Sequence, residues 1–321
     1  MKRLLLLSCL LLPSVYGQEI QFTFQIYQAD PAIGIALEDR LIAGGEGAAT
    51  AIAKLPDFVR QGRLEELATL SFASPSGERT IQKSEGGLVT LPTREATEGL
   101  EVEIDPVVRN GVIDLNIFAA FVSREKGDPI ERTLTTQTRG PLGGPMLLCR
   151  WQREDEWVLL LGTATIAGGA PAASVAGDVL YIESAYYPSA SAAKSRRDTL
   201  ASTRIPCLNG QRCRSQIIGW IDDENILEDD QPGFRSVLDP KLGEDGTLTL
   251  GVNCGHIVEA GGRTRLDSGE RVRRLELRDV SDTFTLTEGE PTGSKATVAG
   301  LDDVKAEEDD YVAGFTFVRS Q

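Results

Sequence analysis

A segment that begins with glycine and ends in Asp-Pro occurs twice in this chain, and a turn signal follows it each time. The segment covers residues 99–106 in the first half and residues 233–240 in the second half, 134 positions later. Asn110-Gly111 follows the first occurrence and Asp245-Gly246 follows the second, 135 positions apart. Both dipeptides are strong signals for a tight turn between antiparallel strands. The duplication therefore predicts that one β-architecture is built twice in tandem.

Alternating apolar residues predict strands around these turns. Residues 18–28 alternate as a half-buried strand does, and residues 179–187 are their counterpart. After each turn signal, alternate residues form a face that we expect to point inward: Ile113, Leu115, Ile117, Ala119 and Phe121, and in the second copy Leu248, Leu250, Val252, Cys254 and His256. Ser76-Gly77 and Asn209-Gly210 predict a hairpin-like strand pair in each copy. The fold class is thus mainly β with a minor α+β part: two tandem, mostly antiparallel β-domains.

The first copy is longer than the second between its first two strands, and the extra residues predict a helix near residues 48–67. Ile52, Leu55, Phe58 and Val59 recur at helical spacing, and Pro56 interrupts the helix or begins a new turn. We expect the helix to cover one face of the sheet, with docking to a partner as the alternative. The second copy has no such segment, and residues 164–177, rich in Ala and Gly, join the two copies.

The first 17 residues have the pattern of a secretory signal peptide. Lys2 and Arg3 precede an apolar stretch over residues 4–12, and Gly17 ends a run of small residues before cleavage at Gln18. The alternative is an ordinary buried helix. We expect an exported protein of the periplasm or outer membrane, or of the extracellular medium. No later segment has 18 consecutive apolar residues, so no transmembrane helix is predicted.

Length and charge narrow the class of protein. The 321 residues fit two domains, which the duplication places at residues 18–165 and 166–321. The net charge is −15, and the acidic residues are dispersed among apolar strands. This charge disfavours nucleic acid and anionic lipid as partners. We therefore expect protein partners or self-association through strand edges, with association with the outer membrane as an alternative.

Four cysteines follow the leader, and an even count in an exported chain favours disulfide bonds. Cys207 and Cys213 flank the Asn209-Gly210 turn, which makes them the candidate disulfide pair. The alternative is two free thiols whose side chains diverge, because disulfide geometry is strict. The sequence offers no prediction for Cys149 and Cys254. Zinc is disfavoured, since no second close Cys/His pair exists.

Residues that can carry chemistry are few. His256 is the only histidine, and any catalytic triad would have to use it. Its place on the inward face beside Cys254 indicates a core histidine rather than a general base. The acidic runs at residues 222–230 and 307–310 lack the spacing of a calcium loop, and the basic residues at 263–274 are interleaved with acids. We predict no catalytic residue, no cofactor and no metal site.

The order of elements resembles the C-terminal domain of bacterial secretins, the outer-membrane ring proteins of type II and type III secretion and of pilus systems. The resemblance rests on a first strand, a strand that runs into a small turn, a Gly-apolar-x-apolar strand ending in Pro, an Asn/Asp-Gly turn, and a late strand ending in Gly. These stand at residues 20–27, 67–77, 99–106, 110–111 and 157–162, and again at 179–187, 200–210, 233–240, 245–246 and 297–300. The resemblance implies a degenerate, doubled secretin-like protein.

These observations favour a non-enzymatic protein of the cell envelope that acts by binding or assembly. Exposed strand edges would be the physical route, because they invite pairing with another chain. A link to protein secretion is what the resemblance to secretins implies. The alternative is a monomeric β binding module of the periplasm or medium, stapled by a disulfide and without a role in secretion. A third interpretation is a hydrolase that uses His256.

Overall fold

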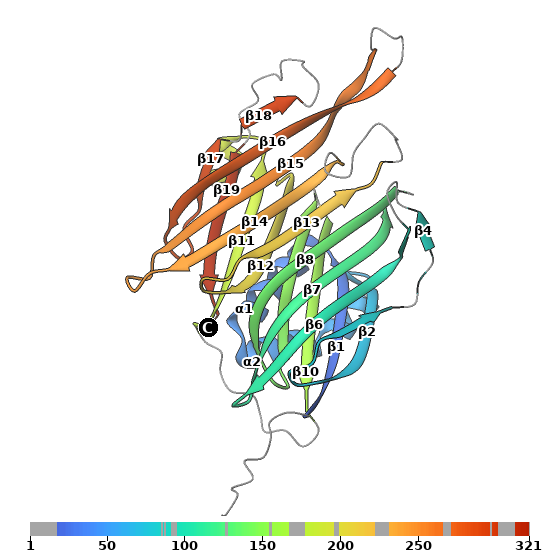
Figure 1. Cartoon of the computed structure of the whole chain (residues 1–321), viewed down its shortest axis with the longest axis vertical. Coiled ribbons are helices and arrows are strands. Elements are labelled where there is room, and N and C mark those ends of the chain that lie inside the picture. Colours follow the sequence, from blue (N-terminus) through green and yellow to red (C-terminus); the bar gives the residue numbers. More distant parts are fainter. Residues whose placement is uncertain are drawn as a thin grey trace, which may run out of the picture.

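The structure is a computed structural model that describes residues 18–84, 86, 88–90, 95–125, 128–153, 156–166, 177–195, 199–221, 231–265, 271–295, 297–300 and 312–320. The predicted signal peptide lies outside these residues, as do the acidic runs at 222–230 and 307–310 and the centre of the predicted linker. The described part is mainly β, as the sequence predicts (Figure 1).

Each half of the chain supplies a similar series of strands. The first half forms β1 (Glu19–Ala29), β2 (Leu64–Pro75), β3 (Thr80–Lys83), β4 (Leu88–Thr90), β5 (Glu95–Thr97), β6 (Gly99–Arg109), β7 (Val112–Glu125), β8 (Asp128–Pro141), β9 (Pro145–Arg153) and β10 (Glu156–Thr165). The second half forms β11 (Val179–Tyr187), β12 (Ala201–Leu208), β13 (Cys213–Gly219), β14 (Gly233–Leu242), β15 (Leu248–Arg265), β16 (Arg271–Leu286), β17 (Thr292–Lys295), β18 (Thr297–Gly300) and β19 (Val312–Arg319).

These strands form two large antiparallel sheets that pack face to face. Sheet A has the order β17-β19-β11-β12-β9-β10-β1-β2, and sheet B has the order β18-β16-β15-β14-β13-β8-β7-β6-β3. The short β4 and β5 pair separately. Strands of both halves therefore lie in both sheets, as the colours in Figure 1 show. One buried apolar cluster between the sheets includes Phe24 and Leu100 from the first half and Ile182 and Phe234 from the second.

The strand order confirms the predicted duplication. The first half reads β9-β10-β1-β2 in sheet A, and the second half repeats this order as β17-β19-β11-β12. In sheet B, β8-β7-β6-β3 of the first half corresponds to β16-β15-β14-β13 of the second. The registers agree as well, because Leu100 lies opposite Phe121 and its counterpart Phe234 lies opposite His256. All ten residues predicted to form the inward faces of β7 and β15 are buried.

The turns after β2 and β12 differ from the prediction. Both were expected to close hairpins, yet β2 and β12 belong to sheet A, whereas β3 and β13 belong to sheet B. Each turn is an arch that carries the chain from one sheet to the other. The Gly77 N–H donates to Pro106 O at 2.7 Å, and the Gly210 N–H donates to Pro240 O at 2.9 Å. Both glycines have positive φ, so equivalent arches close the same end of both repeats.

The helices also differ from the single helix expected near residues 48–67. Three helices lie between β1 and β2, namely α1 (Pro31–Ala43), α2 (Gly45–Ala53) and α3 (Leu55–Arg60), and residues from Leu64 onward belong to β2. Pro56 stands in the first turn of α3, where its missing N–H costs nothing. The second copy keeps a remnant, α4 (Ala190–Ser195), where the sequence predicted no helix.

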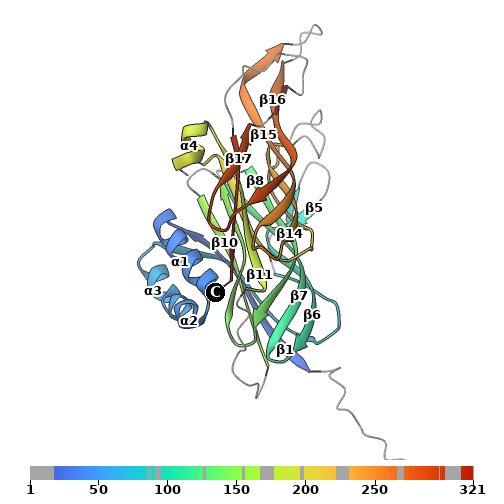
Figure 2. The same cartoon turned by 90° about the vertical axis from the view of Figure 1, so that its left-hand side faces the viewer.

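The helices cover the outer face of sheet A, so the first repeat has three layers (Figure 2). Leu37, Leu41 and Ala51 of α1 and α2 share a second buried cluster with Trp157 and Leu159 of β10. This agrees with the expected role of the helical segment as a cover for a sheet. No helix among the described residues has the length and hydropathy needed to cross a membrane.

Candidate binding site: the repeat junction and the sheet edges

The two repeats are joined through the edges of their sheets. In sheet A, β12 of the second repeat pairs with β9 of the first, from Ala201 opposite Arg153 to Arg204 opposite Arg150. In sheet B, β13 pairs with β8, from Arg214 opposite Thr135 to Gly219 opposite Ile130. We call these two ladders the repeat junction. It demonstrates that one unit of this sandwich can extend the sheets of another by antiparallel strand addition.

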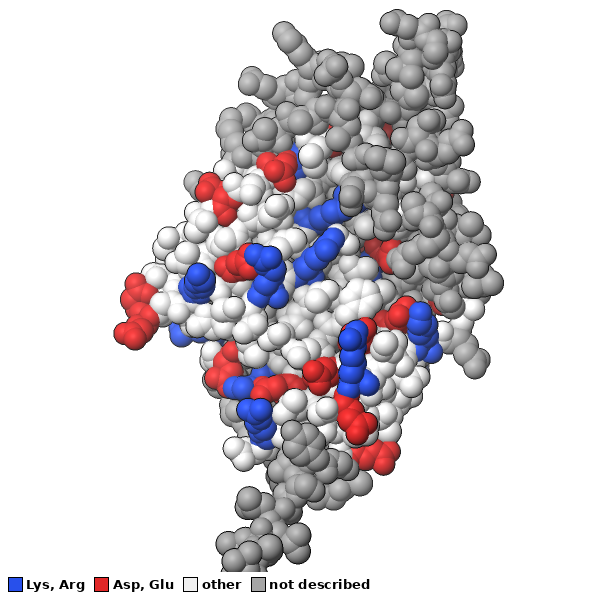
Figure 3. Space-filling view, viewed as in Figure 1, with Lys and Arg blue, Asp and Glu red and all other residues white. Residues whose placement is uncertain are grey.

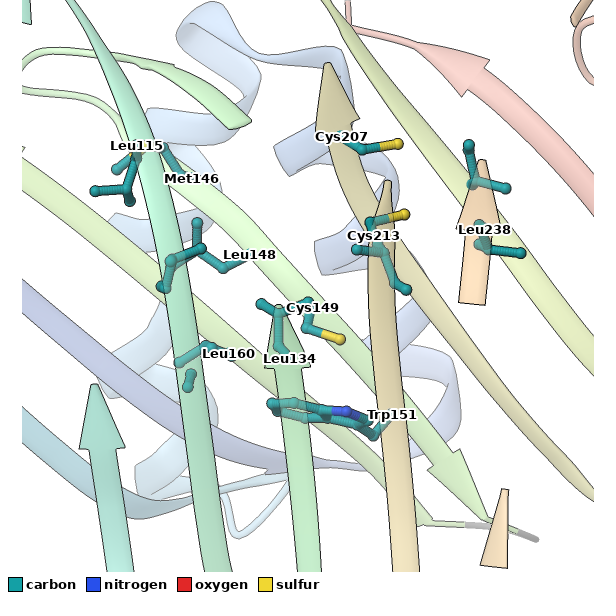
Figure 4. Packing of buried hydrophobic residues seen from close by; sticks show 14 of the residues in the cluster. Leu115, Leu134, Met146, Leu148, Cys149, Trp151, Leu160, Cys207, Cys213 and Leu238 are labelled. Carbon is teal, nitrogen blue, oxygen red and sulfur yellow. The ribbon is translucent and has the colours of Figure 1, made fainter. Parts of the chain in front are cut away.

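Side chains from both repeats fill the interior of the repeat junction (Figure 4). The Trp151 indole is 1% exposed, and its Nε1–H donates to Ser215 Oγ on the opposite sheet at 2.9 Å. The Ser215 hydroxyl in turn donates to Thr133 O at 3.1 Å. The Thr136 hydroxyl of β8 donates to Pro206 O of β12 at 2.5 Å. Because each of these bonds connects β8 or β9 to β12 or β13, they lock the two repeats in one register.

A buried group of four charged residues lies over the repeat junction on the outer face of sheet A. Arg150 and Arg204 stand opposite each other, and the carboxylates of Glu38 from α1 and Glu183 from β11 lie between them. We call these four residues the junction charge cluster. Arg204 lies 2.8 Å from Glu38 and 2.7 Å from Glu183, and Arg150 contacts Glu183 and lies 3.6 Å from Glu38. The cluster ties α1 to both repeats.

The junction charge cluster is balanced and almost closed to solvent. Arg150 is 1% exposed, and its guanidinium lies 4.8 Å from the centre of the Trp157 ring. Burial alone would raise the pKa of Glu183, but the charges of Arg204 and Arg150 outweigh it and hold that pKa well below its ordinary value. Glu183 is therefore ionised at neutral pH and pairs with both arginines.

The edge of the first repeat is open by comparison. We call β2 and β3 the first-repeat edge, since they end sheets A and B. β2 pairs with β1 along its whole length, and within the described residues no strand pairs with its other side. Phe72 packs against the rings of Phe22 and Phe24 yet stays half-buried. Its counterpart Ile205 on β12, covered by the repeat junction, is 0% exposed.

The edge of the second repeat is partly covered by its own chain. We call β17 and β18 the second-repeat edge. β9 runs through nine residues of sheet A, whereas its counterpart β17 has four, after which the chain passes to sheet B as β18. β18 pairs with Glu276–Asp279 of β16, the counterparts of the β8 residues that pair with β13. It therefore occupies the position where a further repeat would add.

The cysteines predicted as a disulfide pair are free thiols in the structure, and so are Cys149 and Cys254. Cys207 lies on β12 in sheet A, and Cys213 lies on β13 in sheet B, so they face each other across the core and do not close a hairpin. Both are buried. A hydrogen bond with Cys207 raises the pKa of the Cys213 thiol, and burial of the thiol raises this pKa further. The predicted bridge is thus replaced by a buried thiol pair at the repeat junction.

His256 is a core histidine, as its strand position predicts. It is 8% exposed and lies 5.5 Å from the Tyr186 ring and 6.4 Å from the Phe234 ring. Burial, together with the charges of Arg278 and Arg153, lowers its pKa to about 3. Burial raises the pKa of the neighbouring Cys254 thiol to about 12, and this thiol donates to Ser236 at 3.3 Å. At neutral pH the pair is therefore a neutral imidazole and a protonated thiol.

His256 also lines a cavity of about 630 Å³ next to the repeat junction, with Trp220, Phe234, Arg153, Arg278 and Glu156 among the other lining residues. The lining therefore combines basic side chains, Arg153 and Arg278, with acidic ones such as Glu156. Among the described residues, no three His, Cys, Asp or Glu side chains are grouped so that they could hold a metal ion. Lys and Arg are also interspersed with Asp and Glu on the face in Figure 3.

Comparison with known proteins gives no relative. No protein-family model, no curated protein and no solved structure matches this chain.

Sequence reasoning missed the residues that build the repeat junction. β9 was not predicted. Leu147, Leu148 and Cys149 are consecutive apolar residues that are buried on both faces of the sheet, so β9 lacks the alternation of polar and apolar residues that marks a half-buried strand. Arg150 and Arg204 gave no signal either, since each is a single arginine whose acidic partners are distant in the chain. The sequence signal that relates β12 to β2 is the repeat itself, because it makes them equivalent strands of the two copies.

Proposed function

We propose that this chain is a non-enzymatic exported protein of the cell envelope that acts by binding or assembly through the first-repeat edge. The repeat junction carries this proposal. At the repeat junction, β12 and β13 receive β9 and β8. β2 and β3 are the counterparts of β12 and β13, and no strand in the described part of the chain is added to them. An extended segment of another polypeptide can add to such an edge through main-chain hydrogen bonds.

The state of the candidate chemical groups supports a non-enzymatic role. His256 and Cys254 are the only neighbouring base and nucleophile that the sequence singles out, and both are buried and uncharged at neutral pH. A general base with a pKa far below the working pH is a poor proton acceptor. The element order that resembles the secretin C-terminal domain supports a link between this assembly and protein secretion.

A peptide that copies β9 tests strand addition directly. β9 is the natural partner of β12, so a fluorescently labelled peptide of Pro145–Arg153, with Cys149 replaced by Ser, is the probe for the counterpart strand β2. We expect a saturable rise in fluorescence anisotropy with the wild-type protein and none with the variant Thr69→Lys/Ser71→Lys, which adds charge to the exposed face of β2. The titration is done at protein concentrations where the chain has the mass of one copy, and absence of binding to the wild type there would contradict the proposed function.

Fractionation of the producing cells tests export. We expect the protein, without residues 1–17, in the periplasm or the outer-membrane fraction. Protein found only in the cytoplasm with the leader intact would contradict an envelope role.

A further inference from the structure

The central part of β2 lacks the features that usually protect a free strand. Natural edge strands are short, charged, interrupted by proline or distorted by bulges. β2 has 12 residues, and from Leu67 to its last residue, Pro75, it contains no charged side chain. The shift in its register with β1 falls between Ile26 and Tyr27, near the other end. The stretch between these two ends is therefore a regularly paired, uncharged edge.

The counterpart position shows what is absent from this edge. Ser71 of β2 corresponds to Arg204 of β12, and the residues opposite them on the neighbouring strands are Thr23 and Glu183. The ion pair between Arg204 and Glu183 is replaced by a contact of 3.1 Å between the hydroxyls of Ser71 and Thr23. Thr69, Ser71 and Ala73 are small and exposed, so the backbone of an added strand can approach closely.

We infer that the strand that adds to β2 is β2 of a second copy of this chain, in a symmetric dimer. This inference rests on the proposed function and names its partner. Every neighbouring pair in sheets A and B is antiparallel, and a two-fold axis perpendicular to sheet A makes two β2 strands antiparallel too. The same axis turns the β3 end of each sheet B toward its equivalent.

The charges of β2 favour this antiparallel arrangement. Its charged residues, Glu65 and Glu66, lie at the first end of the strand. With the axis near Ser71, the acidic ends of the two strands are separated by roughly 30 Å, at about 3.3 Å per residue. That separation is beyond the screening length of about 8 Å at physiological ionic strength. A parallel pairing would instead place the acidic ends side by side.

The second-repeat edge disfavours the head-to-tail alternative. In this alternative, two chains would associate in the same way as the two repeats of one chain. The first-repeat edge of one chain would then pair with β16 and β17 of the next. β18 already pairs with β16 over the residues that such an addition would use. The two-fold dimer uses only the open edge and closes after two copies.

Complementary charge variants test this dimer. One variant carries Thr69→Lys/Ser71→Lys and the other carries Thr69→Glu/Ser71→Glu, all at exposed positions. We expect the wild type to have twice the chain mass in multi-angle light scattering. Each variant alone should dissociate at concentrations at least about tenfold higher than the wild type, because like charges oppose across the pair. An equimolar mixture should recover the dimer. Asn116→Lys is the matched control and should remain dimeric, because this exposed residue lies on β7, with β6 and β3 between it and the end of sheet B.

Two results would overturn the inference. One is a wild type with the mass of a single chain at every concentration up to the millimolar range. The other is a dimer that persists equally in both charge variants, which would place its interface elsewhere. In either case, binding of the β9 peptide decides separately on the proposed function. A monomer that binds the peptide keeps the receptive edge and loses only the second copy as its partner.

Discussion

β12 and β2 are the same strand in two copies of one architecture, yet they lie in opposite environments. β12 is paired on both sides, and its inward residues are fully buried, whereas β2 is paired on one side with Phe72 half-buried. Where β12 carries Arg204 in a balanced ionic group, β2 carries Ser71. The first repeat therefore supplies a partner strand for β12, whereas no strand among the described residues pairs with the outer side of the equivalent β2.

The difference also shows how a junction is made specific. Backbone pairing is common to all strands, but the junction charge cluster and the bond from Trp151 to Ser215 require residues from particular elements. A buried ion pair is costly to form and is more costly to break, so it selects one register among several. The stretch of β2 from Leu67 to Pro75 is uncharged, so pairing there depends on shape and backbone hydrogen bonds.

Disruption of the junction charge cluster should have the largest effect on stability. Arg150→Ala leaves Glu38 and Glu183 buried with one arginine between them, and we expect a loss of about 3–5 kcal/mol in the free energy of unfolding. Chemical denaturation followed by circular dichroism measures it. Arg212→Ala, which removes an exposed ion pair with Asp239, is the control and should change little. Equal effects of the two variants would contradict the role given to the cluster.

Counterpart glycines sharpen the comparison between the repeats. Gly233 begins β14 with φ 152°, and a Cβ there would lie 2.0 Å from Ile217 O. Its counterpart Gly99 has φ 113°, and a Cβ would meet the Ser84 hydroxyl, a side chain that can rotate away. We expect Gly233→Ala to cost about 3 kcal/mol or more and Gly99→Ala clearly less. Thermal unfolding of both variants checks this order, and the reverse order would refute it.

Stability should depend on pH through His256, which has no titrating counterpart in the first repeat. Its folded pKa of about 3 lies below the ordinary value of 6.5, so the stability it contributes is complete above pH 6.5 and is lost as pH falls toward 3. Between pH 7 and pH 5 this loss is roughly 2 kcal/mol. His256→Phe, which installs the residue type of Phe121, should flatten the stability difference between these two pH values. An unchanged difference in the variant would mean that other groups cause it.

The thiols at the repeat junction should be unreactive in the folded protein. Burial raises the pKa of Cys149 and Cys254, and Cys213 shares a hydrogen bond with Cys207. A thiol reagent such as 5,5′-dithiobis(2-nitrobenzoate) should modify none of these four cysteines at neutral pH until denaturant is added, and then all of them. If only two react in denaturant without a reductant, two of the four cysteines form a disulfide, contrary to the free thiols of the structure.

The sequence predicted what depends on local pattern. Alternation identified the inward faces of β7 and β15, and the repeated Gly and Pro positions identified the equivalent β6 and β14. It failed where pairing is non-local. A turn at Asn209-Gly210 has the same signature in a hairpin and in an arch, and only the rest of the sheet decides which forms. The observed helices differ in their bounds from the predicted one, because Pro56 lies in the first turn of a separate helix and the residues from Leu64 onward belong to β2.

Hydrogen exchange of β2 and β12, measured by mass spectrometry at low and high protein concentration, tests the central claim most directly. We predict that β12 exchanges slowly at both concentrations, because it is paired on two sides. β2 should exchange faster at low concentration and gain protection at high concentration in the wild type, and should gain none in Thr69→Lys/Ser71→Lys. Slow exchange of β2 at both concentrations in that variant would contradict the claim that its outer side is an open edge.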